Sequence, residues 1–574
     1  MARTSVAIVF AGSGGAGAMT AGTVLLRAAA HAGYYGLMTQ LFGPQVRGGE
    51  AAALIQIATE PVEAQPNRFD LFVALDWDKV EQFSAEIPLD GASAILADPA
   101  AGPVPPSVAK SKARVVALAF GDRHGTLLEH GVGGRRVNMF AAGVAAALAG
   151  VNERHLMAAI EAVLGGKAAA AAAANEAAAA SGVAAAAGLT LNLRLDPPRP
   201  ASQRWLISGN QALALGALRG GVRFVGCYPI TPATDLVEWL APEIRKLGGR
   251  LVQAEDELAA INMTLGASYG GIPAMTVTSG PGISLMGETL GLAVAAEIPA
   301  VVVDVMRAGP STGIASKTEQ SDVNIAIYGG HGDAPRVVLA PISVADCLNT
   351  AEYAVYVAES LQTPVIVLSD QALGQARTVI VANGKRPKPL KRRTNGAPPG
   401  TPLFKRYAVD SDPLTAMPVP GTPGYQWVAE GLTHNEVGLP ASGAGMHVAQ
   451  INKRARKLQR FDPGELWGEN WGEGDTVLLV FGSSVGPARV AAARLAAAGR
   501  PVRVVALRLL SPLPLQAIAR ALHGARRVIV VEQNHGAQLY RHLLGQKAIA
   551  PSAESVARPG PLPFRPAEIA SYVM

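Results

Sequence analysis

The chain has 574 residues, of which 49% are apolar and 16% charged; this excludes an intrinsically disordered protein and allows three or four domains of ordinary size. The net charge of +6 is spread along the sequence, and the one dense basic run, 385–393, has no aromatic residues between its charges, so we expect a solvated linker there and no nucleic-acid site. The only two cysteines, Cys227 and Cys347, exclude a disulfide scaffold and a four-cysteine iron–sulfur site held by this chain alone, and they fit a reducing compartment such as the cytoplasm.

The first block, residues 1–195, alternates strands and helices. Val6–Phe10 is too short for the apolar core of an export signal and reads as a first strand, followed by a helix from about Thr20 to Ala32. Further apolar strands are expected at 53–57, 69–75 and near 115–120. This alternation predicts an α/β domain with a mostly parallel sheet.

The end of this block, 167–188, is low-complexity alanine interrupted by Asn175, Glu176 and Ser181. Because alanine gains little in lipid, we expect a helix and a spacer there and no membrane span.

Two turns of the first block are rich in glycine. Gly12-x-Gly14-x-x-Gly17 has the spacing of the dinucleotide fingerprint, but the region about 20 residues further on holds no acid for a ribose. A tight βα turn or a different phosphate ligand is therefore favoured over NAD or FAD. The second turn, Arg47-Gly-Gly-Glu50, is equally compatible with an anion site and with a plain loop.

The second block, 201–385, follows a proline-stiffened linker at Asp196–Pro200. We expect a helix capped by Ser208, a helix that follows Thr234 and another that begins near Glu257. Strands are predicted at 223–226, 274–278, 300–305 and 364–368, and the last three are short, apolar and bounded by Gly or Pro, as buried parallel strands are.

The remaining chain divides in two. Residues 386–473 are rich in Pro, Gly and charge and predict a connecting segment with a helix near 447–458. The third block, 474–574, has predicted strands at 476–481, 502–507 and 528–532, which indicates a small α/β domain.

The loop Tyr228-Pro-Ile-Thr-Pro232 follows a predicted strand of the second block. Its two prolines restrict the backbone and direct the Thr231 hydroxyl from the carboxyl end of a strand, where parallel α/β sheets bind ligands. An ordinary strand-to-helix turn explains the same residues equally well.

Glu257 stands at the start of a helix of small and apolar residues. Its carboxylate can complement the helix dipole, but Glu255 and Asp256 can do so too, which leaves one acid for other work. Buried against a nitrogen heterocycle, Glu257 could share a proton with a ring nitrogen.

Two further loops follow predicted strands. Ser279-Gly-Pro-Gly282 could turn its backbone amides toward a ligand. Arg307 follows the strand at 300–305 and suits a carboxylate clamp, although a surface arginine would fit the same pattern. His331 is expected to be structural.

Together these motifs resemble the α subunit of 2-oxoacid:ferredoxin oxidoreductases, most closely the 2-oxoglutarate type, in which a γ domain is fused ahead of α. The resemblance rests on residues 228–232, 255–261, 278–286, 304–313 and 329–333, on 12–17 with 47–49, and on 430–436 and 531–538. It implies a γ-type α/β domain, a parallel-sheet domain that binds the pyrimidine of thiamine diphosphate, and a C-terminal transketolase-like α/β domain.

The resemblance also implies the chemistry. Thiamine diphosphate would lie between this chain, with Tyr228, Pro229, Ile230, Glu257, Ser279 and Gly280 in contact, and a β subunit that holds Mg²⁺, the diphosphate and an iron–sulfur cluster. Glu257 would protonate the pyrimidine and promote the ylide, Thr231 would lie near the substrate carbonyl, and Arg307 would receive the substrate carboxylate. The 2-oxoacid would then be decarboxylated, two electrons would leave through the cluster to ferredoxin, and CoA would take the acyl group.

The sequence departs from the family pattern near the expected substrate pocket. Ala233 stands where Ser is common, Ala315 replaces a second proline, and Ser316 replaces Thr. An aromatic or branched 2-oxoacid is therefore kept beside 2-oxoglutarate as the substrate. A nucleotide-dependent oxidoreductase that uses Gly12–Gly17 and a non-catalytic scaffold subunit also stay open.

Overall fold

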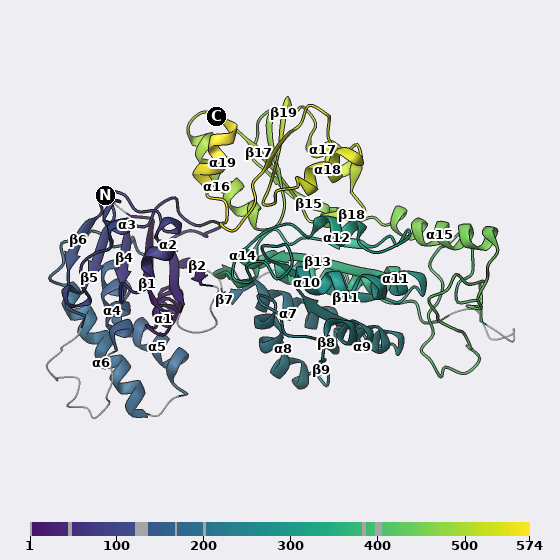
Figure 1. Cartoon of the computed structure of the whole chain (residues 1–574), viewed down its shortest axis with the longest axis horizontal. Helices are drawn as coiled ribbons and strands as arrows, with labels where there is room; N and C mark the ends of the chain where they lie inside the picture. Colours follow the sequence, from purple (N-terminus) through teal and green to yellow (C-terminus); the bar gives the residue numbers. More distant parts are fainter. Residues whose placement is uncertain are drawn as a thin grey trace. The chain divides into compact units, whose positions relative to one another are not determined.

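The computed structural model of the chain describes residues 3–43, 49–120, 136–166, 169–198, 203–381, 386–395 and 404–574. Its contacts divide the chain into two compact units. Unit 1 contains 1–208, 376–383 and 565–568, and unit 2 contains 209–375, 384–564 and 569–574. Figure 1 labels most of the helices and strands of both.

Unit 1 is built on an eight-stranded sheet of order β6-β5-β4-β1-β3-β2-β14-β7. The strands are β1 (Ser5–Ser13), β2 (Tyr35–Phe42), β3 (Glu50–Ala58), β4 (Leu71–Ala74), β5 (Ala94–Ala97), β6 (Arg114–Ala117), β7 (Arg204–Ser208) and β14 (Arg377–Val381). Strands β1, β4, β5 and β6 are parallel, whereas β3 pairs antiparallel with β1 and β2, and β14 antiparallel with β2 and β7. Within 1–195, for which we expected a mostly parallel sheet, three pairings are parallel and two are antiparallel; the antiparallel ones arise because β2 and β3 follow each other without a crossover helix.

Four helices of unit 1 pack on one another and form its larger core: α1 (Ala18–His31), α4 (Val137–Ala149), α5 (Glu153–Leu164) and α6 (Ala169–Ala186). Gly143 lets α4 and α6 approach closely, because a Cβ at this position would lie 2.1 Å from the Ala179 carbonyl oxygen. The short helices α2 (Val80–Phe83) and α3 (Pro106–Ala109) complete the unit. Among the described residues, no helix combines the length and the hydropathy needed to cross a bilayer.

Unit 2 has a central seven-stranded sheet of order β18-β12-β13-β11-β10-β8-β9. Its strands are β8 (Phe224–Cys227), β9 (Arg250–Gln253), β10 (Ala274–Thr278), β11 (Ala300–Met306), β12 (Val337–Leu339), β13 (Pro364–Asp370) and β18 (Leu509–Ser511). All pairings are parallel except that between β12 and β18. The predicted buried parallel strands at 274–278, 300–305 and 364–368 are thus confirmed.

The helices that connect these strands are α7 (Gly209–Gly220), α8 (Thr234–Lys246), α9 (Glu257–Tyr269), α10 (Gly280–Leu285), α11 (Gly287–Ala295), α12 (Val323–Tyr328), α13 (Val344–Leu361) and α14 (Gln371–Gln375). The helix expected after Thr234 is α8, which begins at Thr234 itself, and the helix expected near Glu257 is α9.

A second sheet of unit 2 has the order β15-β17-β16-β19-β20. Its strands are β15 (Gly468–Trp471), β16 (Thr476–Val480), β17 (Arg503–Leu507), β19 (Arg527–Glu532) and β20 (Glu554–Ala557), and its helices are α16 (Val485–Ala497), α17 (Leu515–Ala521), α18 (Gln538–Gly545) and α19 (Pro566–Val573). Buried Gln320 joins this sheet to the central one. Its side-chain Nε2 donates to the Phe481 carbonyl (3.0 Å), and its backbone carbonyl accepts from the Asn534 side chain (3.0 Å).

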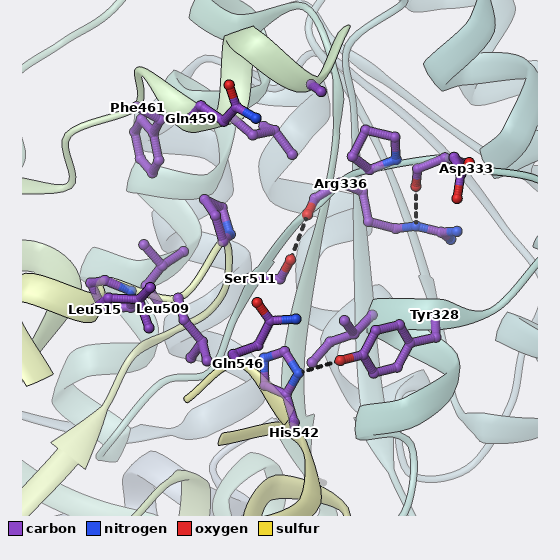
Figure 2. Close-up of a pocket in the computed structure, with 18 of the residues that line it drawn as sticks. Tyr328, Asp333, Arg336, Gln459, Phe461, Leu509, Ser511, Leu515, His542 and Gln546 are labelled. Atoms are coloured by element: carbon purple, nitrogen blue, oxygen red, sulfur yellow. Dashed lines mark hydrogen bonds between the residues drawn. The ribbon is translucent and has the colours of Figure 1, made fainter. Parts of the chain in front are cut away.

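Unit 2 also has a pocket of about 820 Å³ (Figure 2). Apolar side chains from 451–463 and 509–515 line it together with Tyr328 and His542. His542 Nε2 lies 2.9 Å from the Leu510 carbonyl and therefore carries the proton, so Tyr328 donates its hydroxyl to His542 Nδ1 at 2.6 Å.

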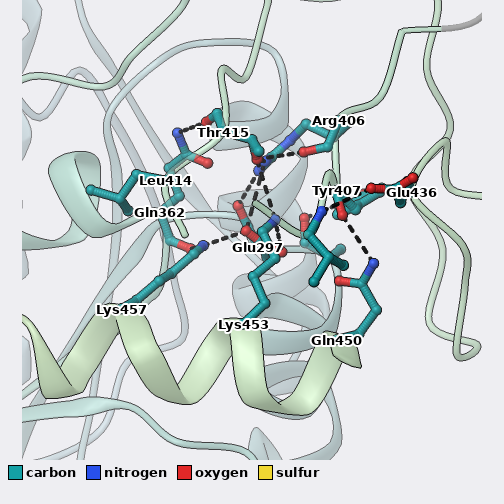
Figure 3. Close-up of polar contacts among 12 residues, drawn as sticks. Glu297, Gln362, Arg406, Tyr407, Leu414, Thr415, Glu436, Gln450, Lys453 and Lys457 are labelled. Atoms are coloured by element: carbon teal, nitrogen blue, oxygen red, sulfur yellow. Dashed lines mark hydrogen bonds and ion pairs between the residues drawn. The ribbon is translucent and has the colours of Figure 1, made fainter. Parts of the chain in front are cut away.

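A buried charge cluster, which we call the Glu297 cluster, joins the segment 404–459 to the rest of unit 2 (Figure 3). Glu297 accepts from Lys453 at 2.7 Å, pairs with Lys457, and lies 3.8 Å from the Arg406 guanidinium. The side chains of all four residues are at most 2% exposed. Lys453 and Lys457 lie on α15 (Ala444–Gln459), so the helix predicted near 447–458 exists and is part of a packed interface.

Burial and the neighbouring cations act in opposite directions on the pKa of Glu297. Burial alone would raise the pKa of Glu297, but the three cations around it hold that pKa far below its ordinary value. Burial also lowers the pKa of Lys457 to about 7. One carboxylate thus faces three buried cations.

Candidate active site

The candidate site lies at the carboxyl ends of three adjacent parallel strands, β8, β10 and β11. The loop Tyr228–Pro232 follows β8, the loop from Ser279 follows β10, and Arg307 follows β11. Because this end of an open parallel sheet is where ligands bind, the predicted site residues are at the expected edge.

Glu257 is the first residue of α9, and its side chain is buried. Its neighbour Asp256 caps the helix by accepting a 2.7 Å hydrogen bond from the Ala259 amide. Glu257 is therefore free of the capping role, and within the described residues it forms no hydrogen bond or ion pair. Its carboxylate is therefore available to a ligand that supplies a proton or a ring nitrogen.

Gly282 makes room for Glu257. A Cβ at position 282 would lie 2.9 Å from Glu257 Oε1 and 2.0 Å from Thr278 Oγ1. The carboxylate is thus packed against the first turn of α10, which begins at Gly280.

Thr231 and Arg307 contact each other directly. Arg307 donates a 2.6 Å hydrogen bond to the Thr231 carbonyl oxygen, and Asn210 on α7 donates to the next carbonyl, that of Pro232, at 2.9 Å. The Thr231 residue itself is exposed, and its contact with Arg307 uses the backbone carbonyl rather than the hydroxyl.

Arg307 is a buried residue, which excludes a surface arginine at this position. Burial lowers its pKa, and its Nε is buried without a hydrogen-bond acceptor among the described residues. An arginine in this state suits an anionic ligand that supplies the missing acceptor.

The other predicted cofactor contacts differ in exposure. Tyr228 and Pro229 are exposed, Ile230 is half-buried, and Ser279 is fully buried with its Oγ unpaired within the described chain. At Gly280 a Cβ would lie 2.8 Å from Asp322 Oδ2, so this loop has no space for a side chain on that side.

The loop after Arg307 is compact. The Gly309 amide donates to Glu319 Oε2 at 3.1 Å, and Ala308 bridges to Ile314. Gly313 has φ +53° and a Cβ there would lie 1.7 Å from the Ala308 carbonyl oxygen, so the loop requires glycine at this position.

Sequence reasoning missed two acids beside this loop. Asp304 lies on β11 and is fully buried, and Asp322 directly precedes α12. A lone acid inside the apolar run Ala300–Met306 was a usable signal for Asp304. Asp322 comes into place only through the tertiary fold.

The glycine run of unit 1 forms a tight turn between β1 and α1. The Ser13 amide and hydroxyl both donate to the Asp76 carboxylate, at 2.8 and 2.7 Å. A carboxylate therefore takes the donors at this turn, which favours a structural βα turn over a dinucleotide site. Arg47 of the second turn lies outside the described residues.

The glycine-rich motif 329–333 lies apart from the candidate site. His331 and Asp333 are exposed, and Asp333 lines the pocket of Figure 2, whose lining contains none of Thr231, Glu257 and Arg307. Groups of three or more metal-ligating side chains are absent from the described part of the chain.

Three family models match the chain. "Pyruvate flavodoxin/ferredoxin oxidoreductase, thiamine diP-bdg" matches residues 215–453, "Pyruvate ferredoxin/flavodoxin oxidoreductase" matches 7–185, and "Transketolase, C-terminal domain" matches 470–537.

Curated relatives agree with these models. The 2-oxoglutarate oxidoreductase subunit KorA of Mycobacterium tuberculosis is 37% identical over 65% of this chain, and the match spans 57% of that protein. The 2-oxoglutarate synthase subunit KorA of Methanothermobacter marburgensis is 35% identical over 65% of this chain and 99% of its own length.

A solved structure matches the whole chain. The 2-oxoglutarate:ferredoxin oxidoreductase of Magnetococcus marinus, with 2-oxoglutarate, coenzyme A and succinyl-CoA bound, is 33% identical and covers 100% of this chain and 99% of its own, with a TM-score of 0.88. The chain therefore belongs to the 2-oxoacid:ferredoxin oxidoreductase family and is related to its α subunits.

Proposed function

We propose that the chain is the α subunit of a 2-oxoglutarate:ferredoxin oxidoreductase, which decarboxylates the 2-oxoacid oxidatively and transfers the acyl group to CoA. The observation that carries the proposal is Glu257, a buried carboxylate that has no partner within the described residues. It stands in a chain whose full length matches a 2-oxoglutarate:ferredoxin oxidoreductase.

The residues present fit thiamine diphosphate. Glu257 would hold a proton at the pyrimidine nitrogen, and Tyr228, Pro229, Ile230, Ser279 and Gly280 would contact the ring. Ser279 supports this assignment because its buried Oγ needs a partner. When bound, the cofactor supplies a carbon nucleophile and an electron sink.

Arg307 would orient the substrate. Its guanidinium is held by the Thr231 carbonyl through one nitrogen, and its unpaired Nε can donate to the carboxylate of the 2-oxoacid. The exposed Thr231 hydroxyl would lie beside the substrate carbonyl, which leaves the reacting carbon next to the coenzyme.

A partner β subunit would supply what this chain lacks. Cys227 and Cys347 are both buried, and burial raises their pKa values, that of Cys227 to about 11. Neither thiol is suited to hold a cluster. The Mg²⁺–diphosphate site, the iron–sulfur cluster and the contact with ferredoxin are therefore assigned to the partner.

The substrate assignment rests on the relatives that are named for 2-oxoglutarate. Ala233 is fully buried, whereas Ala315 and Ser316 are half-buried in the loop after Arg307. Substitution at these positions leaves an aromatic or branched 2-oxoacid as the second candidate.

The test is to produce the chain with its native β partner and to measure CoA-dependent viologen reduction with 2-oxoglutarate, pyruvate, and branched and aromatic 2-oxoacids. We expect the highest kcat/KM with 2-oxoglutarate. Preference for another acid would correct the substrate, and no reduction with any of them would refute the proposed function.

A matched pair of variants tests Glu257. Glu257→Gln should lower kcat by about 10²–10⁴-fold, the usual contribution of a positioned acid or base, while the complex stays assembled. Glu238→Gln, on the exposed face of α8, should retain full turnover. Near-normal turnover of Glu257→Gln would remove this residue from its role.

A further inference from the structure

Glu319 joins two parts of unit 2 that lie far apart in the sequence. Its side chain is buried, and its Oε2 accepts a hydrogen bond from the Gly309 amide at 3.1 Å. Its Oε1 accepts from the Gly560 amide at 3.2 Å, 241 residues further along the chain. Gly309 is the second residue after Arg307, whereas Gly560 follows β20 of the second sheet. One carboxylate thus ties the loop after Arg307 to the second sheet of unit 2.

The two residues after Glu319 are held by the same part of the fold. The Gln320 amide donates to the Gln533 carbonyl at 2.7 Å, and the Gln533 amide donates to Gln320 Oε1 at 3.0 Å. Gln538 of α18 holds the next residue, since its Nε2 donates to the Ser321 carbonyl at 2.7 Å. These three consecutive residues are therefore fixed to the second sheet and its helix, and the Glu319 carboxylate extends this fixed base to the loop.

The loop after Arg307 leaves the central sheet and returns to the same place. The Ala308 amide donates to the Lys317 carbonyl at 3.0 Å and closes the loop at its neck. Residues 309–314 are exposed, so the buried contacts that hold the loop lie at this neck. Arg307 stands directly before the neck and donates to the Thr231 carbonyl at 2.6 Å. A shift of the neck would therefore move the guanidinium as well.

We propose that Glu319 is a positioning residue for Arg307. It fixes the neck of the loop against the second sheet, so that the guanidinium meets the carboxylate of the 2-oxoacid in a set orientation. The second sheet, which contributes none of the predicted site residues, acts on substrate binding through this carboxylate. The inference rests on the proposed function and adds to it a residue that touches neither the coenzyme nor the substrate.

The two donors explain why this position carries a carboxylate. Both are backbone amides, so both partners must be acceptors, and a carboxylate presents two acceptor oxygens. A glutamine has nearly the same size but one acceptor oxygen, and its NH₂ group would face the N–H group of the other amide. Glu319→Gln therefore breaks one of the two bonds with little change in side-chain volume.

The decisive experiment compares kcat/KM for two substrates, measured on the complex with its native partner. The value for the 2-oxoacid reports its binding and decarboxylation, whereas the value for CoA reports the later acyl transfer. Glu319→Gln should lower kcat/KM for the 2-oxoacid about tenfold, because Arg307 is misplaced, and should leave kcat/KM for CoA unchanged. A purely structural role would instead reduce the amount of active enzyme and lower both values equally.

Glu436→Gln is the matched control. Glu436 also accepts from a backbone amide, that of Val409, at 2.9 Å, but both residues belong to the segment 404–459. This variant should keep the wild-type kcat/KM for both substrates. Equal loss of both values in Glu319→Gln, or loss of neither, would overturn the inference.

A second variant reaches Glu319 from the other end of the connection. A Cβ at Gly560 would lie 2.4 Å from the Thr318 carbonyl oxygen, so Gly560→Ala should displace the segment that carries Glu319. It should show the same selective loss of kcat/KM for the 2-oxoacid. Gly545→Ala, at the end of α18, places its Cβ in open space and should retain both values. Equal kcat/KM values in the two alanine variants would count against the connection.

Hydrogen exchange supplies a readout that needs no turnover. Glu319→Ala removes both acceptors, so the Gly309 and Gly560 amides should exchange faster than in the wild type, while the Val409 amide stays protected. Unchanged exchange at the two glycines would also overturn the inference. Absence of any 2-oxoacid activity in the wild type would instead refute the proposed function, and the exchange rates would still report whether Glu319 holds the loop.

Discussion

The Glu297 cluster offers the sharpest test of what holds unit 2 together. Glu297→Gln removes the one carboxylate that faces Arg406, Lys453 and Lys457, all with side chains at most 2% exposed, and leaves the cations without a counter-charge. Loss of one partner from a buried ion pair costs about 3–5 kcal/mol. For a cooperative unit of about 350 residues, this corresponds to a fall in Tm of roughly 4–7 °C.

The assay is scanning calorimetry of the wild type and four variants, Lys457→Met alone included, at one pH and scan rate. Glu554→Gln is the matched control, because Glu554 pairs with Arg527 at 2.7 Å but both side chains are substantially exposed, and such a pair contributes at most about 1 kcal/mol. Removal of one buried cation in the double variant Glu297→Gln/Lys457→Met should recover part of the loss. Equal Tm values for Glu297→Gln and the control would refute the reasoning. It would also be refuted if Lys457→Met lowered the Tm as much in the Glu297→Gln background as it does in the wild type.

Three further outcomes follow from the structure. Gly282→Ala should displace Glu257, because the new Cβ would lie 2.9 Å from Glu257 Oε1, and titration calorimetry of the complex should then show weaker binding of thiamine diphosphate. Gly266→Ala on α9 is the control, because nothing lies within 4 Å of the new Cβ, and it should bind the cofactor normally. Equal binding by the two variants would contradict the packing argument. Arg307→Lys should raise KM for the 2-oxoacid by about 10–100-fold with a smaller effect on kcat. A lysine ammonium cannot both donate to the Thr231 carbonyl and offer the substrate carboxylate the paired donors of a guanidinium. An unchanged KM would exclude Arg307 as the group that binds the substrate carboxylate. The pKa of Lys457 is lowered to about 7, so above pH 7 the native protein binds fewer protons than the unfolded chain. The free energy of unfolding should therefore rise between about pH 7 and pH 10. Lys457→Met should flatten this rise in a series of denaturant titrations.

The sequence predicted the elements of unit 2 better than those of unit 1. Strands such as Ala274–Thr278 and Ala300–Met306 are buried on both faces, and their continuous apolar runs identify parallel strands directly. In unit 1, β2 was missed because apolar and polar residues alternate only weakly in Tyr35–Phe42. Strand β14 was missed because the strands it pairs with lie more than 150 residues away in the chain. Local patterns do not carry such pairings.

The candidate site was predictable where local sequence patterns position its residues. Strand ends placed the Tyr228–Pro232 loop and Arg307 at one edge of the sheet, and the surplus of acids before α9 left Glu257 free once Asp256 capped the helix. The packing of Asp322 against Gly280 joins segments 42 residues apart, and no local pattern marks this contact. The Glu297 cluster likewise joins one acid to cations more than 100 residues away.

The pairing of β7 with β14 has a consequence for anyone who wishes to study the amino-terminal module separately. Its sheet is completed by Arg377–Val381, a strand that the chain supplies only after residues 209–375 of unit 2. A fragment cut near residue 195 would leave the Tyr35–Phe42 strand with an open hydrogen-bonding edge, and such edges invite association between molecules. A soluble excised module would need that late strand grafted back, for example through a short hairpin.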